Sequence, residues 1–289
     1  MSLQIQTAAI DARATTRLWQ IAAAAGFAIL AVIMAVVQVN AVSSPVAYTN
    51  VALTQQEIDT NWAPDRTTPS GGFSSVTFGG RSNVLQMGIN KDNASTLGAP
   101  NTFYLTEGLQ RQIPLSDSVK ADLYVDSDWT TNNKTVRAGL WGVGKDNSNV
   151  IQSYPIVEFT TEGFTGWRKW DVDHWVNLPS VPYQTNSWNT LELTHDSDTN
   201  TYAVKINGAV VSSITDETST KLGAVILNSR NYGSSAASYT VHWSKLAYGN
   251  VLTSPQSKDD CKGTSWQTFG FKNQGLCLQQ VNTGKDSRL

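Results

Sequence analysis

The sequence is poor in charged residues. They make up 15% of its 289 positions, compared with about 25% in ordinary soluble domains. Glycine, serine, threonine and asparagine take their place, a composition that favours strands and turns over helices. The net charge is −2 and no long basic run occurs, so no nucleic-acid partner is expected.

Cysteine is almost absent, and the two that occur, Cys261 and Cys277, lie near the C-terminus. A zinc site would need two further ligands, which this tail lacks. A local pair of cysteines in an exported protein most often closes a disulfide. The chain-entropy model gives a loop of this size a stabilisation of about 3 kcal/mol. We therefore expect a disulfide.

Two common signatures of catalysis and nucleotide binding are missing as well. The sequence contains no Gly-x-Ser-x-Gly elbow and no glycine-rich phosphate loop before a helix. Tryptophan, by contrast, is abundant, with 10 residues in the chain. These rings either fill a core or offer flat surfaces on which ligands with apolar faces, such as sugars, can stack.

The N-terminal segment is apolar. Residues 18–56 carry no charge, and 21–37 is almost continuously apolar. Arg13 and Arg17 precede this run, so the N-terminus is expected to stay in the cytoplasm while the rest is exported. The run is longer than the usual signal-peptide core of about 7–15 residues. It is slightly shorter than the roughly 20 residues that span a membrane.

Two fates of this leader remain open. Val39 and Ala41 occupy positions −3 and −1 of a plausible cleavage point, where small residues are needed. Cleavage would release a signal peptide, whereas an uncleaved segment would anchor the protein in the membrane. The expected organisation is a leader at 1–41, a linker and lead-in at 42–72, a β domain at 73–250 and a disulfide-closed tail at 251–289.

Strand patterns fill the β domain. One face of the segment 119–125 carries Val119, Ala121, Leu123 and Val125. The pair Asn207-Gly208 separates two apolar segments and suits a type I′ hairpin turn. About a dozen such segments, with turn signals every 8–12 residues, favour a sandwich or jelly roll of antiparallel strands.

The order of these strands resembles the concanavalin A-like lectin/glucanase superfamily. The resemblance is carried by the segments 104–113 and 119–125, by Arg137-Ala-Gly-Leu-Trp141, and by the region from Trp188 to the Asn207-Gly208 turn. It implies a jelly-roll sandwich of two antiparallel sheets over residues 60–250. It also implies that a sheet in the middle of the chain forms a broad glycan-binding groove.

The tail has a resemblance of its own. From Asp260 to Cys277 it resembles a short C-terminal motif of bacterial secreted and surface proteins. The shared elements are the Cys-Lys-Gly start, one tryptophan, and Phe-Lys-Asn-Gln-Gly before the second cysteine. This resemblance implies a bacterial envelope protein, and the tail is expected to be a small hairpin-like knob.

Two carboxylates are candidates for catalysis. The glucanase branch of the superfamily uses Glu-x-Asp-x-Glu on one strand, and Glu158 and Glu162 have the spacing of the outer pair. Thr160 stands where the central aspartate is expected. The two backbones lie about 13 Å apart in an extended strand, whereas a retaining pair of carboxyls needs about 5–5.5 Å.

The densest aromatic and polar cluster spans 166–175. Strict alternation would place Trp170 and Trp175 on opposite faces of one strand. The cluster is either an ordinary half-buried strand or a sugar-stacking surface. The candidate ligand-binding residues are Arg137, Trp141, Glu158, Trp167, Trp170 and Trp175.

Calcium is the one cofactor for which the sequence offers ligands. The aspartate pairs Asp126 with Asp128 and Asp171 with Asp173 are weak candidates, since Ca²⁺ takes six to eight oxygens. Solvated turns are the alternative interpretation of both pairs.

The sequence thus predicts an exported bacterial cell-surface or secreted protein that binds a polysaccharide or glycoconjugate without catalysis. A glycoside hydrolase or polysaccharide lyase that uses Glu158 is the first alternative. A structural or adhesion protein is the second.

Export is testable on intact cells. Residues from Val42 onward should be cut by protease added outside cells or spheroplasts, because the leader directs them across the membrane. The measurement is the loss of the full-length band without lysis. Full protection of the β domain would contradict export.

Overall fold

The computed structural model describes residues 45–93, 106–131, 134–215, 218–230 and 237–288. The predicted leader lies outside these ranges, so neither a signal peptide nor an anchor is assessed. Within them, no helix has the length and apolar character needed to cross a bilayer.

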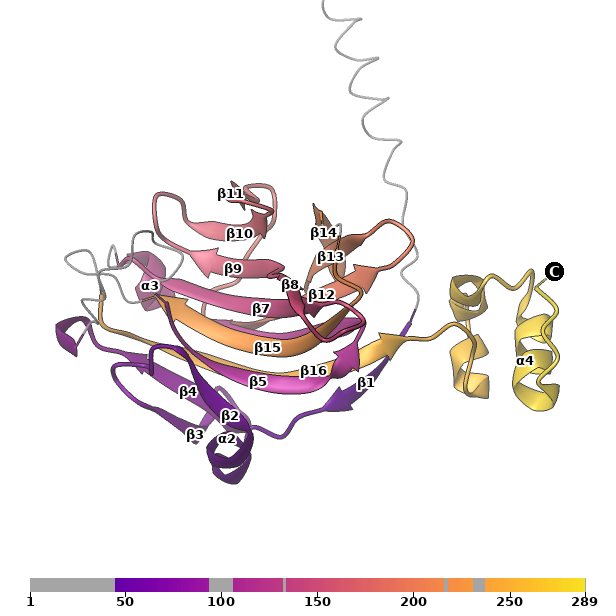
Figure 1. Ribbon diagram of the computed structural model, residues 1–289, viewed down its shortest axis with the longest axis horizontal. Helices are drawn as coiled ribbons and strands as arrows, with labels where there is room; N and C mark the ends of the chain where they lie inside the picture. The colour runs from indigo at the N-terminus through magenta and orange to yellow at the C-terminus, as the bar shows by residue number, and fades with distance from the viewer. Residues whose placement is uncertain (1–44, 94–105, 132–133, 216–217, 231–236, 289) are drawn as a thin grey trace, which may run out of the picture. The chain divides into compact units, whose positions relative to one another are not determined.

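Residues Ser44–Gln256 form one compact unit, and the residues from Ser257 onward belong to a second. The first unit is a sandwich of two antiparallel sheets with eight strands each (Figure 1). This architecture confirms the fold class expected from the sequence. The antiparallel pairing is maintained throughout both sheets.

The first sheet, here called sheet A, has the order β14-β13-β12-β6-β16-β4-β3, and β1 also pairs with β16. Its strands are β1 (Val46–Asn50), β3 (Phe73–Phe78), β4 (Arg81–Ile89), β6 (Ser118–Val125), β12 (Ser187–Asp196), β13 (Thr201–Ile206), β14 (Ala209–Thr215) and β16 (Tyr239–Val251).

The second sheet, sheet B, has the order β11-β10-β9-β7-β15-β5-β2, and β8 also pairs with β7. Its strands are β2 (Trp62–Arg66), β5 (Thr106–Ser116), β7 (Arg137–Lys145), β8 (Ile151–Ser153), β9 (Ile156–Thr160), β10 (Gly166–Asp171), β11 (His174–Asn177) and β15 (Lys221–Arg230).

The helices among the described residues of this unit are short. They are α2 (Gln55–Asn61), η1 (Lys91–Asn93) and α3 (Ser127–Thr131). The hydroxyl of Thr54 caps α2 by accepting a hydrogen bond from the backbone N–H of Glu57 at 3.1 Å, which satisfies one of the free donors at the helix start.

The main core lies between the two sheets. Val119, Ala121, Leu123 and Val125 of β6 all point into it and are fully buried, which confirms the face predicted by alternation. Large rings fill the rest of this layer, and those that are almost fully buried include Trp129, Phe159, Trp167, Tyr202 and Trp243.

The Asn207-Gly208 turn is also confirmed. It joins β13 to β14, and both residues have positive φ angles, of 51° and 82°. Those angles are what a type I′ turn requires, and asparagine and glycine adopt them most readily.

The segment 42–72 is more than a lead-in. The strand β1 pairs with β16 in sheet A, and β2 pairs with β5 in sheet B, so the sandwich begins well before residue 73. Both strands are short and only partly buried. The strand β2, which contains Pro64, is the last in the strand order of sheet B. Such edge strands lack the clear alternation that identifies a buried strand.

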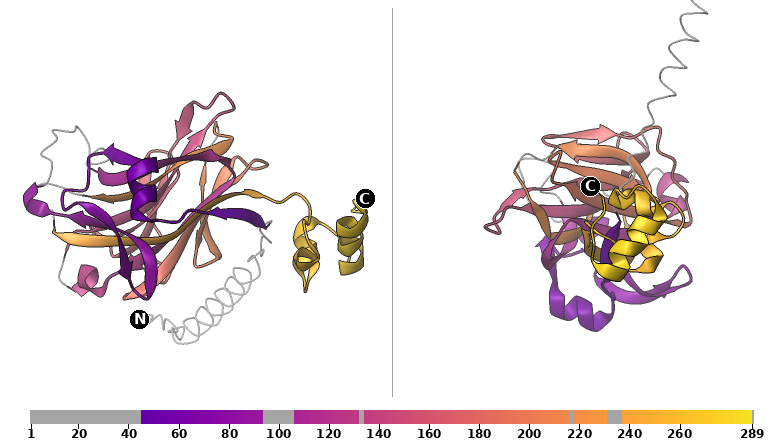
Figure 2. Two further views of the ribbon diagram at one scale, coloured as in Figure 1. Left: turned by 90° about the horizontal axis from the view of Figure 1, so that it is seen from below. Right: turned by 90° about the vertical axis from the view of Figure 1, so that its right-hand side faces the viewer.

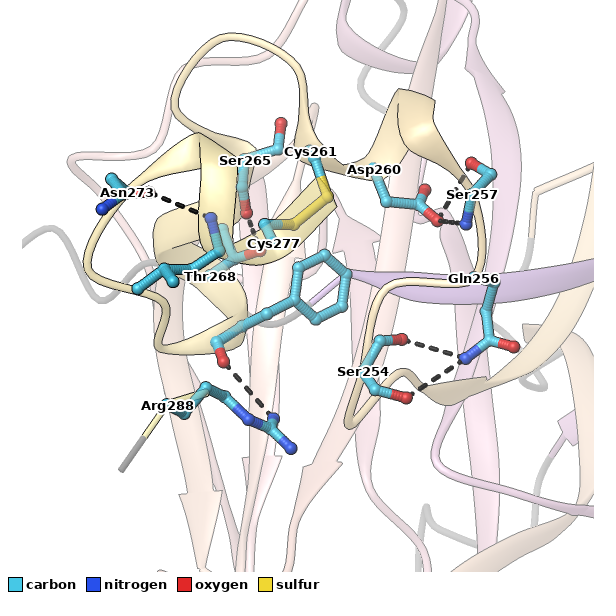
Figure 3. Close-up of a disulfide and its surroundings, with 12 residues drawn as sticks. Ser254, Gln256, Ser257, Asp260, Cys261, Ser265, Thr268, Asn273, Cys277 and Arg288 are labelled. Carbon is cyan, nitrogen blue, oxygen red and sulfur yellow. Dashed lines mark hydrogen bonds between the residues drawn. A yellow bond between two sulfur atoms is a disulfide. The ribbon is translucent and has the colours of Figure 1, made fainter. Parts of the chain in front are cut away.

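The C-terminal unit is helical, so the predicted hairpin-like knob is wrong. It consists of η4 (Lys258–Cys261), η5 (Ser265–Phe269) and α4 (Gln274–Thr283), drawn in yellow in Figure 2. Cys261 and Cys277 form the expected disulfide, with Cα atoms 5.7 Å apart (Figure 3). Asn273 caps α4 by accepting a hydrogen bond from the backbone N–H of Leu276 at 3.0 Å. This helix start was not identified from the sequence, in which the spacing of the cysteines guided the prediction.

Loss of the disulfide should affect the C-terminal unit alone. Replacing both Cys261 and Cys277 by serine should destabilise this unit by about 3 kcal/mol, because few other buried side chains hold it together. Limited proteolysis should then remove the tail, while the thermal transition of the sandwich stays unchanged. Thiols that react in the native, unreduced protein would contradict the pairing.

Candidate functional site

A second apolar cluster lies on sheet B, separate from the core between the sheets. It contains Trp141, Val143, Ile156, Ala224 and Ile226, with Tyr154, Trp170 and Trp175 packed against it. These side chains alternate along their strands with those of the main core. They therefore lie on the face of sheet B that is directed away from sheet A. Such outer faces are usually polar, so this concentration of rings marks a candidate site.

The register of the strands arranges the outer face in rows. One row, here called the aromatic row, runs across five neighbouring strands of sheet B, in the order β11, β10, β9, β7 and β15. Its members, in order, are Trp175, Trp170, Ile156, Trp141 and Ile226. The indole rings of Trp170 and Trp175 meet edge to face, with centroids 5.2 Å apart, and both remain partly exposed.

The adjacent row, here called the polar row, is offset by two residues on each strand, toward the same side of the sheet. It crosses the sheet from β11 to β2. Its members, in order, are Asn177, Arg168, Glu158, Gly139, Asn228, Gly108 and Asp65. The outer face thus places a strip of rings beside a strip of hydrogen-bonding groups.

Four charged side chains form what we call the Arg–Glu network: Arg137, Glu158, Glu162 and Arg168. Arg168 donates from Nε to Glu158 Oε1 at 2.6 Å and from Nη2 to Glu162 Oε2 at 3.3 Å. Arg137 Nε lies 3.0 Å from Glu162 Oε2 and 3.4 Å from Glu158 Oε1. Two positive and two negative charges therefore balance one another.

Because most of the network is buried, the loss of one of its charges would leave another buried without a counter-charge. The side chain of Glu158 is fully buried and that of Arg137 is 4% exposed, whereas Glu162 is 31% exposed. Burial lowers the pKa of Arg137, the charge of Glu158 opposes that shift, and nearby Arg168 adds to it. Glu158 is thus the counter-charge that keeps two guanidiniums inside the protein.

The guanidiniums also contact the aromatic row. The Cζ atoms of Arg168 and Arg137 lie 4.2 Å and 5.1 Å from the ring centroid of Trp175. Arg66 Cζ lies 5.3 Å from the ring of Trp141. These are cation–π distances, so the charged groups fix the positions of two tryptophans on the outer face.

The structure brings together five of the six predicted ligand-binding residues. Arg137, Trp141, Glu158, Trp170 and Trp175 all lie on the outer face of sheet B. Trp167 is not among them: it is fully buried in the main core, and its Nε1 donates to the carbonyl of Pro182 at 3.1 Å.

The prediction that Trp170 and Trp175 lie on opposite faces is wrong. The segment 166–175 is a hairpin of β10 and β11, and the two tryptophans are cross-strand partners. The chain reverses at Val172 and Asp173, where Val172 adopts a φ of 58°. A β-branched residue rarely takes this left-handed conformation, but the turn itself agrees with the alternative interpretation of Asp171 and Asp173 as a solvated turn.

Sequence reasoning missed Asn228 and Asp65. Each belongs to the polar row only through cross-strand pairing, Asn228 opposite Gly139 and Asp65 opposite Gly108. Burial raises the pKa of the Asp65 carboxyl, and Arg66, 2.7 Å away, opposes the shift. Partners this distant in sequence leave no local motif, so no signal in the chain could have identified them.

The two catalytic candidates are held by the same guanidiniums. A general acid or base must reach the atom whose proton it moves. Glu158 is fully buried and directs Oε1 to Arg168, and Glu162 faces both arginines. The arrangement therefore suits positioning of the arginines and Trp175 better than proton transfer.

The calcium candidates have other partners. Asp128 pairs with Lys134, and Asp171 accepts from Lys169 Nζ at 2.6 Å. Exposed Asp173 pairs with its neighbour His174. Across the described ranges, no three histidine, cysteine, aspartate or glutamate side chains group closely enough to hold a metal ion.

No family model matches the chain, and no curated protein is similar to it in sequence. Solved structures with a similar fold include a sialidase, at 12% identity, TM-score 0.44 and 73% coverage of this chain, which spans 19% of that protein. A Bacillus licheniformis β-glucanase matches at 10% identity and TM-score 0.40, covering 71% of this chain and 97% of its own. A basic winged bean lectin with Tn-antigen matches at 12% identity and TM-score 0.41, covering 71% and 98%.

At this level of identity the likeness concerns the fold alone.

The Arg–Glu network gives a stability prediction. Glu158→Gln should lower the free energy of unfolding by about 3–5 kcal/mol, because it leaves two buried guanidiniums short of a counter-charge. Glu162→Gln is the matched control and should lower it by about 1 kcal/mol or less, since Glu162 is partly exposed. Denaturant midpoints measure both. Equal effects of the two changes would contradict the assigned role of Glu158.

Proposed function

We propose that this chain is an exported, non-catalytic protein that binds polysaccharide on the outer face of sheet B. The observation that supports this proposal is the aromatic row beside the polar row on one sheet face. The strands that carry the aromatic row, β11, β10, β9, β7 and β15, are labelled in Figure 1. A pyranose ring has an apolar face and a rim of hydroxyl groups, so it complements both rows at once.

Trp170 and Trp175 are the contact residues of this proposal. Both rings are partly exposed, and their edge-to-face packing holds them in place. The arginines under Trp175 support the ring from the protein side. A rigid ring reduces the entropy lost on binding, which favours affinity for a flexible polysaccharide.

Export is part of the proposal. The apolar leader with two preceding arginines supports it. The Cys261–Cys277 disulfide supports it too, because such bonds persist mainly in oxidising compartments outside the cytoplasm.

The hydrolase and lyase alternative is weaker on this geometry. It would use Glu158, whose carboxylate neutralises buried guanidiniums. A reducing-sugar assay on the same polysaccharides separates the two functions, and release of sugar ends that is lost in Glu158→Gln would favour the enzyme. A structural or adhesion role without glycan binding predicts no retention on any polysaccharide.

Removal of a contact ring should weaken binding. Trp170→Ala and Trp175→Ala should each reduce retention on an insoluble polysaccharide up to about tenfold, since an aromatic contact contributes roughly 0.5–1.5 kcal/mol. The measurement is affinity electrophoresis or pull-down over a panel of polysaccharides, with thermal unfolding in parallel.

The matched control is Trp188→Ala. Trp188 is also partly exposed and lies beneath a guanidinium, that of Arg81 at 4.2 Å, but it belongs to sheet A. It should keep full retention. The proposal fails if all three variants bind alike, or if the native protein is retained on none of the panel.

A further inference from the structure

The charged side chains beside the aromatic and polar rows form ion pairs in which arginines neutralise carboxylates. Asp65 pairs with Arg66 at 2.7 Å, and the Arg–Glu network pairs two arginines with two glutamates. Lys145, four residues beyond Trp141 on β7, lies about 13 Å further along the strand. It is buried, and its Nζ donates to Gln112 at 3.2 Å.

This balance disfavours an acidic ligand. A carboxylate or sulfate group would have to take a guanidinium from Asp65, Glu158 or Glu162. The displaced carboxylate would then remain in a largely buried place without its counter-charge, which is unfavourable. An uncharged sugar displaces none of these pairs.

Two side chains of the polar row contain buried polar atoms without a hydrogen-bond partner. Asn228 is fully buried, and in the described part of the chain neither its Nδ2 nor its Oδ1 has a hydrogen-bond partner. The same holds for Oε2 of Glu158 among those residues. Nearly all buried polar atoms in native proteins have a partner, so these three atoms are a marked exception.

The three atoms lie within the polar row. Glu158 and Asn228 flank Gly139 on neighbouring strands, so their backbones are roughly 10 Å apart. Gly139 contributes no side chain between them. The space that its Cβ would take is filled by Glu158 Cβ, at 2.9 Å, and by Trp141 Nε1, at 3.0 Å, so the polar group of the indole lies against Gly139.

We infer that the site selects uncharged polysaccharides and that Asn228 recognises their hydroxyl groups. An amide offers both a donor and an acceptor, as does a hydroxyl. The inference rests on the proposed function, since it names the ligand class and a specificity residue of that same face.

Matched pairs of polysaccharides test the selectivity. Retention of the native protein is compared on hydroxyethyl cellulose and carboxymethyl cellulose, and on dextran and dextran sulfate, at low and at raised salt. The neutral member should be retained at least about tenfold more strongly, with little salt dependence. Stronger retention of the acidic member, falling as salt rises, overturns this inference and leaves the proposed function intact. No retention on any polysaccharide removes the proposed function and this inference with it.

Variants of Asn228 test the recognition. Asn228→Ala, and Asn228→Leu as a change that keeps the volume, should lower retention about fivefold to tenfold. Asn228→Leu should keep or raise thermal stability, because the amide has no partner among the described residues and its removal breaks no hydrogen bond.

Asn189→Ala is the matched control. Asn189 is equally buried, but its Nδ2 donates to the carbonyls of Gln184 and Ser187 at 3.0 Å and 3.2 Å on sheet A. It should lose stability and keep retention on the neutral member. If Asn228 variants lose stability and keep retention in the same way, Asn228 is structural and its role in recognition is excluded.

Discussion

The ion pair between Glu158 and Arg168 is the contact on which the outer face of sheet B depends. It joins β9 to β10 through fully or nearly fully buried charges 2.6 Å apart. The same carboxylate faces Arg137 on β7, and both guanidiniums lie against Trp175 on β11. Four strands are therefore linked by one set of charges. Because a buried charge needs its partner, these side chains can be arranged in few other ways.

That constraint gives the face its chemical character. Because the charges of the network neutralise one another, the outer face presents neutral rings and amides rather than an electrostatic potential of one sign. In the proposed site the aromatic row would supply contact area and the polar row directional groups, as in most small-molecule sites. The Arg–Glu network thus acts through the rings that it positions, and its own charges are occupied within the protein.

Much of the fold could be predicted from the sequence, because period-two alternation and turn chemistry are local. The buried face of β6 and the Asn207-Gly208 turn follow from such patterns. The turn at Val172 was indicated only by the flanking Asp171 and Asp173, since the β-branched residue between them rarely adopts a positive φ. Asn228 joins the site only through its register with Gly139. The sequence therefore predicted three rings and Glu158 of the candidate site but misplaced Trp167. The paired strands alone reveal Asn228 and Asp65 in the polar row.

The tryptophans, which the sequence left open between core and ligand platform, lie both in the core and on the outer face of sheet B. Trp167 and Trp170 are three residues apart on β10, and in a strand an odd separation places side chains on opposite faces. One accordingly fills the core between the sheets, and the other packs on the outer face with Trp141 and Trp175. Position in the pleat, rather than residue type, decides which role each ring has. Two rings on one short strand thus connect the stability of the sandwich with the surface proposed to bind glycans.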